Sequence, residues 1–162
     1  MKKIIIVAVA KNGVIGRKSG EMPWHVKEEF QHFKNTTMGF PIIMGRKTFI
    51  SLGYSPLKGR LNIILSKNKD YKVKSSDDVM VLHSLREAIK HCEDKNYEKA
   101  FIIGGGIVFE EGIELADEMI VSRMKFEAEG DVVFPLIKEA LWEVKSIEEH
   151  KEFDIYTYVK RA

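Results

Sequence analysis

Short apolar runs alternate along the chain with segments in which apolar residues recur every three or four positions. The first run, Ile4–Ala10, is apolar throughout, as expected for a strand buried on both faces of a parallel sheet. We predict strands at Ile4–Ala10, Pro41–Met44, Asn62–Leu65, Val79–Leu82, Lys99–Ile103, Glu118–Lys125, Val132–Phe134, Trp142–Ser146 and Ile155–Lys160. We predict four helices, roughly at His25–Thr36, Lys47–Leu52, Leu85–Lys95 and Ile107–Ala116. This alternation predicts an α/β fold with a mostly parallel sheet, and the helix-poor last third predicts an antiparallel edge.

The segment Leu85–Lys95 has clear local helix signals. Ser84 and Glu87 are spaced as a capping box, in which each side chain accepts a hydrogen bond from the backbone at the helix start. Apolar residues then recur on one helix face, at Leu85, Ala88, Ile89 and Cys92. Cys92 is therefore predicted to be a core residue, because nothing near it in sequence would lower the pKa of its thiol.

Composition limits the classes of protein that need to be considered. At 162 residues, the chain has the usual size of one domain, so we expect residues 1–162 to form a single domain. The 26 basic and 24 acidic residues nearly balance, and no basic stripe with interleaved aromatic residues predicts a nucleic-acid partner. The single cysteine, Cys92, fits a reducing compartment and allows neither an internal disulfide nor a cysteine-rich metal site. The first apolar run is too short to span a membrane, so we expect a cytoplasmic protein.

The helix predicted at His25–Thr36 places one carboxylate beside apolar side chains. At about 100° per residue, Val26 and Phe33 lie within roughly 60° of Glu29 around the helix axis. Glu28 lies about 100° away on the other side and is predicted to be an ordinary solvated residue. Glu29 is therefore predicted to face an apolar region.

A buried carboxylate without a partner is costly, so Glu29 requires either a protein cation or a ligand. No Lys or Arg lies three or four positions away, and His25 or His32 is the side chain there that could pair with it. The residues themselves leave two interpretations open. Glu29 is either a structural acid at the edge of the core or the anchor of a ligand site.

Two strand-to-helix turns have the composition of phosphate-binding loops. Gly104-Gly105-Gly106 follows a strand and opens a helix, so its backbone could approach a pyrophosphate at the helix N-terminus. It does not complete the dinucleotide-binding fingerprint, and a tight structural turn is the alternative. The second turn, Met44–Thr48, places Arg46 and Lys47 at a helix N-terminus, where the helix dipole disfavours cations unless an anion is bound. With Ser66 after the next strand, these basic residues favour the 2′-phosphate of NADPH, although a solvated basic turn is the alternative.

The ordered set of motifs resembles the dihydrofolate reductase family over nearly the whole chain. The resemblance rests on Val14-Ile15-Gly16, Met22-Pro23-Trp24, Phe30 to Thr37, Ile43 to Thr48, Gly59-Arg60 with Asn62-Ile63-Ile64, Ile103 to Gly106, and Glu129-Gly130-Asp131 with Phe134-Pro135. It implies a central eight-stranded, mostly parallel sheet with an antiparallel C-terminal strand and about four flanking helices. It also implies hydride transfer from NADPH to 7,8-dihydrofolate, antifolate inhibitors as further ligands, no metal, and a monomer.

The resemblance assigns roles to individual residues. It implies that Glu29 holds the amidine-like edge of the pterin ring and favours protonation of N5, that Ser122 supports this acid, and that Trp24 holds an active-site water. It implies that Arg60 grips the α-carboxylate of the glutamate tail. The other substrate contacts that it implies are Ile6, Val7, Phe33, Leu52 and Ile103, together with Glu29 and Ser122. The cofactor contacts that it implies are Ala8, Ile15, Gly16, Gly45, Arg46, Lys47, Thr48, Ser66, Gly104, Gly105, Gly106 and Phe109. Residues 16–22 match the mobile loop that closes over the nicotinamide.

Several residues depart from the family pattern. Glu29 stands where many bacterial members have aspartate, so the carboxylate is displaced by one methylene. Tyr54-Ser55 replaces an arginine-proline pair, with one residue inserted before Gly59, which changes the outer pocket. Phe109 replaces a frequent tyrosine, and the loop at Arg17–Glu21 is one residue longer than in some members.

Two alternative functions must be considered for this sequence. The pyrimidine deaminoreductase of riboflavin synthesis resembles this pattern in sheet and NADPH site, but Glu29 and Arg60 argue against it. A nucleotide-binding protein that has lost catalysis is the second, and the set of Trp24, Glu29 and Ser122 argues against that. The sequence has no His-Glu-x-x-His motif or cysteine pair, so a metal enzyme is not expected.

Overall fold

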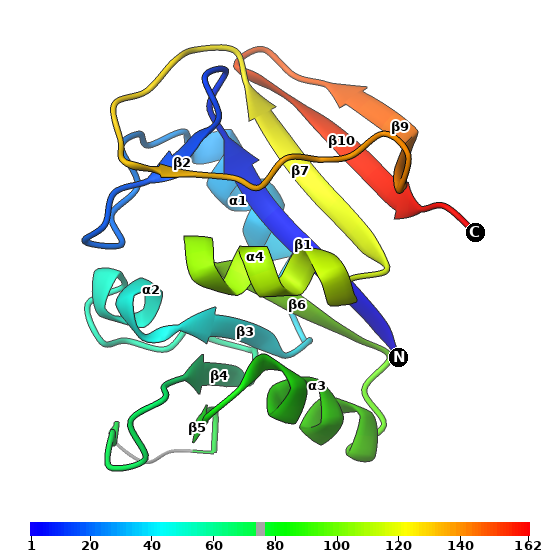
Figure 1. Cartoon of the computed structure of the whole chain (residues 1–162). Coiled ribbons are helices and arrows are strands. Elements are labelled where there is room, and N and C mark those ends of the chain that lie inside the picture. The colour runs from blue at the N-terminus through cyan, green and yellow to red at the C-terminus, as the bar shows by residue number, and fades with distance from the viewer. Residues whose placement is uncertain (74–76) are drawn as a thin grey trace.

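The structure is a computed structural model that describes residues 1–73 and 77–162. Its centre is an eight-stranded sheet in the order β5-β4-β3-β6-β1-β7-β10-β9 (Figure 1). These strands are β1 (Lys2–Val9), β3 (Ile42–Gly45), β4 (Asn62–Leu65), β5 (Val79–Leu82), β6 (Lys99–Gly104), β7 (Glu118–Met124), β9 (Trp142–Glu149) and β10 (Phe153–Lys160). The pairs among β1, β3, β4, β5, β6 and β7 are parallel, and β10 is antiparallel to both β7 and β9. The predicted sheet with an antiparallel C-terminal strand is therefore confirmed.

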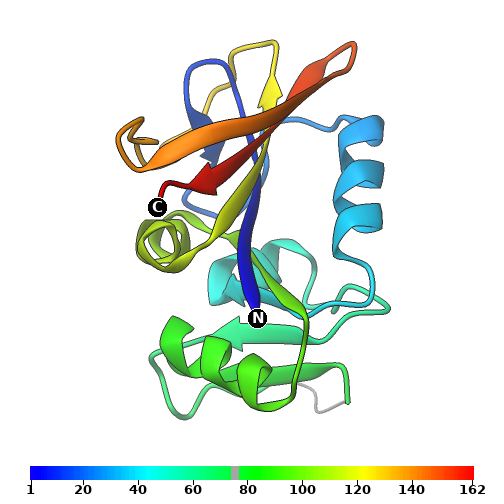
Figure 2. The same cartoon turned by 90° about the vertical axis from the view of Figure 1, so that its right-hand side faces the viewer.

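Four helices flank the sheet in the described part of the chain, and a small second sheet lies near its edge. The helices are α1 (Lys27–Thr37), α2 (Arg46–Ser51), α3 (Leu85–Asp94) and α4 (Gly106–Leu115). Figure 2 shows α1 on one side of the sheet and α3 and α4 on the other. The second sheet pairs β2 (Val14–Gly16) with β8 (Val132–Val133), which lie far apart in sequence.

Side-chain alternation along β1 supplies the apolar core on both faces of the sheet. Ile4 and Ile6 pack in the same cluster as Phe49 of α2, whereas Ile5 and Val7 pack in the cluster that includes the apolar face of α3. Successive strand residues point to opposite faces, so a continuously apolar strand serves both layers. Burial of each such side chain stabilises the fold by about 1.5–3 kcal/mol.

The capping box predicted at α3 is present. The Ser84 hydroxyl accepts a 3.1 Å hydrogen bond from the backbone N–H of Glu87, and the Glu87 carboxylate accepts a 3.0 Å bond from the N–H of His83. Cys92 is fully buried, and burial raises the pKa of its thiol to about 11. The prediction that Cys92 is a core residue is confirmed.

Four boundaries differ from the sequence-based expectation by more than one residue, and one of them is the start of β1, at Lys2 rather than Ile4. Helix α1 begins at Lys27 rather than His25, because Val26 adopts an extended conformation and buries its side chain in a cluster with Phe153. Strand β9 ends at Glu149 rather than Ser146, and strand β10 begins at Phe153 rather than Ile155, so the two strands form a hairpin. Because β9 is exposed at nearly every position after Trp142, its polarity hides its length from pattern analysis.

No helix among the described residues has the length and apolar character needed to cross a membrane.

Candidate active site

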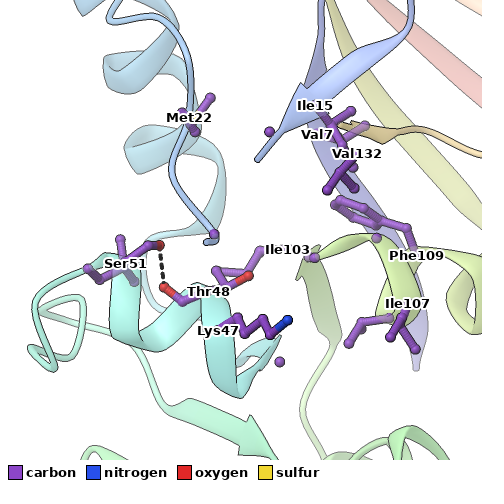
Figure 3. Close-up of a pocket in the computed structure, with 18 of the residues that line it drawn as sticks. Val7, Ile15, Met22, Lys47, Thr48, Ser51, Ile103, Ile107, Phe109 and Val132 are labelled. Carbon is purple, nitrogen blue, oxygen red and sulfur yellow. Dashed lines mark hydrogen bonds between the residues drawn. The ribbon is translucent and has the colours of Figure 1, made fainter. Parts of the chain in front are cut away.

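One large cavity lies at the carboxyl ends of the central parallel strands. It has a volume of about 1580 Å³ and reaches the ends of β1, β3, β4 and β6. Figure 3 shows Lys47, Thr48 and Ser51 of α2 on one side and Ile107 and Phe109 of α4 on the other. In open α/β sheets, ligands bind in the crevice beyond the carboxyl ends of the strands.

The structure brings nearly all of the predicted site residues to this one cavity. Those on its wall are Ile6, Val7, Ala8, Ile15, Gly16, Trp24, Glu29, Phe33, Gly45, Arg46, Lys47, Thr48, Leu52, Arg60, Ser66, Ile103, Gly104, Gly105, Gly106 and Phe109. Ser122 is the exception: it is 1% exposed on β7 and does not line the cavity. Ser122 therefore acts on the site only through the residues in front of it.

Glu29 is a buried carboxyl in the first turn of α1. Only 5% of the residue is exposed, and burial raises the pKa of this carboxyl above its ordinary value. The Ser122 hydroxyl beside it acts in the opposite direction and favours the charged form, although its Oγ has no well-aligned hydrogen bond with any described residue. This partner is neither His25 nor His32, which were the two candidates by spacing. Because the net effect raises its pKa, this carboxyl holds its proton to a higher pH than an exposed glutamate does.

Arg60 is the second buried charge on the cavity wall. Its Nη1 donates a 3.1 Å hydrogen bond to the hydroxyl of Thr37, and its Nε donates a 2.9 Å bond to the carbonyl of Lys58. The Thr37 hydroxyl in turn donates to the carbonyl of Phe33 at 2.8 Å. Arg60 is 7% exposed, and burial lowers the pKa of its guanidinium. Helix α1 thus carries Glu29 near its start and, at its end, Thr37, which orients Arg60. Glu29 and Thr37 lie about 12 Å apart along the helix axis, at 1.5 Å per residue.

Trp24 presents a polar atom to the same region. Its Nε1 is buried and has no hydrogen-bond partner among residues 1–73 and 77–162. The indole packs edge-on against Phe126, with 5.7 Å between ring centroids. A buried indole N–H normally has a partner, so this atom fits a site that receives a polar ligand group or water.

The two glycine turns lie against each other at the centre of the cavity. A Cβ atom on Gly45 would lie 3.3 Å from Val108 and 3.8 Å from the backbone of Gly104, and one on Gly105 would lie 3.5 Å from the Thr48 hydroxyl. Gly104 has a φ of +127°, which side chains rarely allow. Helix α4 starts at Gly106 without a side-chain cap, so its first N–H groups remain available to an anion.

A basic end of the cavity follows β3 and β4. Arg46 and Lys47 begin α2 and are exposed, and the Arg46 guanidinium lies 5.7 Å from the ring centroid of Tyr71. Ser66 lies on the same wall, and its carbonyl is 2.9 Å from Nδ1 of His83. Sequence analysis missed His83, although its position directly before the N-cap of α3 could have drawn attention to it.

The loop preceding α1 packs over the cavity. The N–H of Lys18 donates a 2.7 Å hydrogen bond to the carboxylate of Asp131. Gly20 has a φ of +94°, and a Cβ atom there would lie only 2.5 Å from the carbonyl of Lys47. Glycine at this position therefore permits close contact between the loop and α2. Residues 16–18 and 20–24 all line the cavity, which places them where a lid would act.

The unusual segment at Tyr54 lies away from the cavity wall. Tyr54 has a φ of 59°, is 63% exposed and packs edge-on against Phe49 at 6.3 Å. Leu57, a few residues later, lines the cavity instead. The departure from the family pattern thus affects the outer wall through Leu57 rather than through the tyrosine.

Comparisons with known proteins agree over almost the entire chain. The family model described as dihydrofolate reductase matches residues 3–160. A dihydrofolate reductase of Staphylococcus haemolyticus is 35% identical over 98% of this chain and 95% of its own length, and one of Neisseria gonorrhoeae is 39% identical over 88% and 84%. A dihydrofolate reductase structure from Enterococcus faecalis, complexed with NADP(H) and RAB-propyl, superposes with a TM-score of 0.89 at 31% identity, covering 99% of this chain and 97% of that one. The chain therefore belongs to the dihydrofolate reductase family.

Proposed function

We propose that the protein reduces 7,8-dihydrofolate to 5,6,7,8-tetrahydrofolate with NADPH, and that Glu29 anchors the pterin ring. The observation that carries this proposal is the single cavity that joins the buried carboxyl of Glu29 to the glycine turns at Gly45 and Gly104. The acid that would bind the substrate and the glycine turns that would bind the dinucleotide therefore line the same cavity.

The substrate half of the cavity suits a pterin that carries an acidic tail. A carboxylate at Glu29 accepts two parallel N–H donors from the amidine-like edge of the ring. Phe33 and Leu52 supply apolar surface for the aryl group beyond it. The planar guanidinium of Arg60 then binds the α-carboxylate of the glutamate tail. This assignment accounts for both buried charges on the wall.

The other half fits a phosphorylated dinucleotide. The glycines leave no side chain between the turn and a pyrophosphate, and the N-terminus of α4 favours its negative charge. Arg46 and Ser66 are placed to bind the 2′-phosphate that distinguishes NADPH from NADH. When bound, NADPH supplies the hydride that reduces the C6=N5 imine of dihydrofolate.

The remaining requirement is a proton for N5 of the substrate. Burial raises the pKa of Glu29, so the acid holds a proton to a higher pH than an exposed glutamate, and the Trp24 indole N–H can hold a water that relays the proton. Glu29 acts here as an anchor and a proton-transfer partner, without contact with the carbon that receives the hydride. The loop tied to Asp131 excludes bulk water from the reacting atoms.

The decisive assay follows the loss of NADPH absorbance when purified protein is mixed with dihydrofolate. We expect turnover by the wild-type protein and a fall of about 10²-fold or more for Glu29→Gln near neutral pH. NADPH binding by the variant, measured by fluorescence, should be unchanged. Glu93→Gln, on the far end of α3, is the matched control and should retain full activity. Normal turnover by Glu29→Gln would remove the proposed role of this acid, and NADPH binding without any turnover would instead support a nucleotide-binding protein.

We also propose that residues 1–162 form one domain that works as a monomer in the cytoplasm and binds antifolate inhibitors. The cavity is complete within one chain, and the unpaired, buried Cys92 suits a reducing compartment. Light scattering should give a mass near 18.6 kDa, and twice that mass would contradict the monomer. An antifolate should compete with dihydrofolate, and a change in the KM for NADPH alone would contradict binding in the substrate half.

A further inference from the structure

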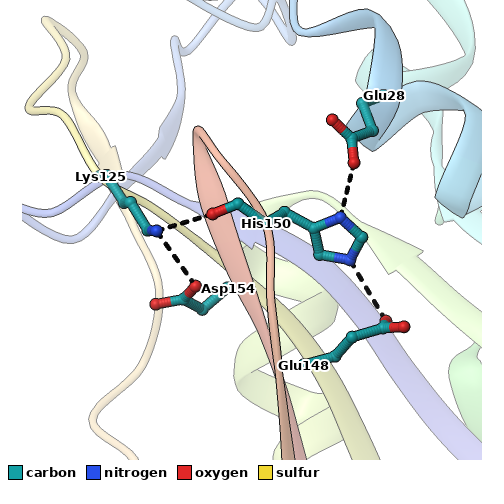
Figure 4. Close-up of polar contacts among 5 residues, drawn as sticks. All are labelled: Glu28, Lys125, Glu148, His150 and Asp154. Carbon is teal, nitrogen blue, oxygen red and sulfur yellow. Dashed lines mark hydrogen bonds and ion pairs between the residues drawn. The ribbon is translucent and has the colours of Figure 1, made fainter.

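His150 lies in the turn of the β9–β10 hairpin, between two carboxylates (Figure 4). Its Nδ1 is 2.6 Å from Oε1 of Glu28 in α1, and its Nε2 is 3.3 Å from Oε2 of Glu148 in β9. The imidazole stacks on the ring of Phe153, with 4.6 Å between centroids and 6° between planes. Glu28 is exposed, as predicted from the sequence, but it also links α1 to a hairpin more than 100 residues away in the chain.

The hairpin turn is itself held by its neighbours. Lys125 donates a 2.6 Å hydrogen bond to the carbonyl of His150 and pairs with Asp154 at 3.3 Å. The N–H of His150 donates a 2.9 Å bond to the carbonyl of Phe153. The imidazole thus projects from a fixed backbone, so its contact with Glu28 can restrain the helix.

The start of α1 has few other restraints. Its N-cap residue, Val26, makes no side-chain capping bond, and residues 17–26 before it contain no helix or strand. Val26 contributes apolar packing in the cluster that includes Phe153. Glu28 and Glu29 are adjacent in the first turn, about 100° apart around the helix axis. A restraint on Glu28 therefore limits rotation of Glu29 about the helix axis.

We propose that His150 is a positioning residue, which fixes the first turn of α1 through Glu28 and so sets the direction in which the Glu29 carboxylate enters the cavity. The proposal rests on the proposed role of Glu29. Bidentate recognition of a pterin edge depends on carboxylate geometry, and misplacement by even about 1 Å can cost much of the rate. His150 itself does not contact the cavity.

The charges around His150 make this restraint depend on pH. The hydrogen bond with Glu28 is the largest cause that raises the pKa of His150, with Glu148 acting in the same direction and partial burial opposing both. His32 of α1 also faces this group, and burial lowers the pKa of its imidazole, so it stays neutral while His150 is charged. A raised pKa means that the ion pair is present at low pH and is lost as pH rises through the pKa of His150. Lys125 and Asp154 contact the turn through its backbone and pair with each other.

Steady-state kinetics of His150→Gln and Glu28→Gln test the proposal. We expect the KM for dihydrofolate to rise about two- to fivefold in each variant, the range for loss of a partly exposed ion pair. The KM for NADPH should not change. The double variant should be no worse than either single variant, because the two residues act as one unit. His91→Gln, a histidine in the last turn of α3, is the matched control and should behave as wild type.

Two further measurements separate positioning from a general loss of stability. The wild-type KM for dihydrofolate should rise with pH through the pKa of His150, and His150→Arg should abolish this part of the rise because its cation does not titrate, leaving only the pH dependence due to Glu29. The pKa of the His150 imidazole, followed by NMR, should fall in Glu28→Gln. An unchanged NMR titration, or lower melting temperatures with normal KM values, would overturn the proposal. Normal turnover by Glu29→Gln would refute the proposed role of Glu29. The kinetics of His150→Gln test the restraint on α1 and do not test the role of Glu29.

Discussion

The backbone N–H of Lys18 donates a 2.7 Å hydrogen bond to the side chain of Asp131, and this bond joins two loops that are 113 residues apart in sequence. Close backbone packing reinforces the contact, because a Cβ atom on Gly130 would lie 2.5 Å from the carbonyl of Gly16. The loop at the cavity is thus held at its base by a segment whose next residue, Val132, also lines the cavity.

We predict that Asp131→Ala loosens the loop and accelerates release of NADPH. Loss of one hydrogen bond, worth about 0.5–1.5 kcal/mol, should weaken NADPH binding by roughly two- to tenfold. Stopped-flow fluorescence measures the release rate directly. Asp131→Asn keeps an acceptor oxygen and should lie between the wild type and Ala. Equal release rates for all three proteins would show that the bond does not restrain the loop.

Arg46 should discriminate NADPH from NADH. We predict that Arg46→Ala weakens NADPH by about 10- to 100-fold, since hydrogen bonds to charged groups contribute about 1.5–3 kcal/mol. Binding of NADH, which lacks the 2′-phosphate, should remain as in wild type. Arg86→Ala, an exposed arginine on α3, is the control. Equal losses for both dinucleotides in titration calorimetry would refute the assignment of Arg46.

Arg60→Lys should separate the glutamate tail from the pterin ring. Lysine keeps the charge but loses the planar fork that Thr37 and Lys58 orient, so the KM for dihydrofolate should rise about tenfold. Dihydropteroate, which has no glutamate tail, should show the same KM with both proteins. A rise for both substrates would mean that Arg60 acts on the ring or on the fold.

The stability of the ligand-free protein should depend on pH through Glu29. Its folded pKa lies above the ordinary value of 4.5, so the native state binds more protons than the unfolded state in this window. Stability due to this group is therefore lost as pH rises from the ordinary pKa through the folded pKa. Glu29→Gln should match the wild type in acid and exceed it near neutral pH, as thermal melts across this range can show. A difference that is constant with pH would contradict the linkage.

Ser122→Ala provides an independent check on the same carboxyl. The Ser122 hydroxyl favours the charged form of Glu29, so its removal should raise the pKa of Glu29 further. The pH at which kcat/KM begins to fall should then move upward, with little change in NADPH binding. An unchanged pH profile would indicate that Ser122 supports the strand rather than the acid.

The family match agrees with the sequence-based argument for a dihydrofolate reductase over the related pyrimidine deaminoreductase. The dihydrofolate reductase model matches residues 3–160, which include both Glu29 and Arg60. These are the two charges by which the sequence argued against a pyrimidine deaminoreductase. Both lie buried on the wall of one cavity.

Local patterns in the sequence determined the parts of the fold that depend on near neighbours. The apolar runs of β1, β4 and β5, the capping box at Ser84 and the glycine turns at Gly45 and Gly104 were all readable, because periodicity and backbone restriction act over a few residues. The side of α1 on which Glu29 lies was equally readable from its spacing to Val26 and Phe33.

Only the tertiary structure decided which distant residues meet. Spacing along α1 offered His25 and His32 as partners for Glu29, whereas the family resemblance implied Ser122, which strand β7 brings behind the acid. Glu28 is exposed as expected, but only the β9–β10 hairpin places His150 against it, and the polar surface of β9 gave no signal of that contact. Such pairings depend on how the sheet orders its strands, and no local periodicity in the chain encodes that order.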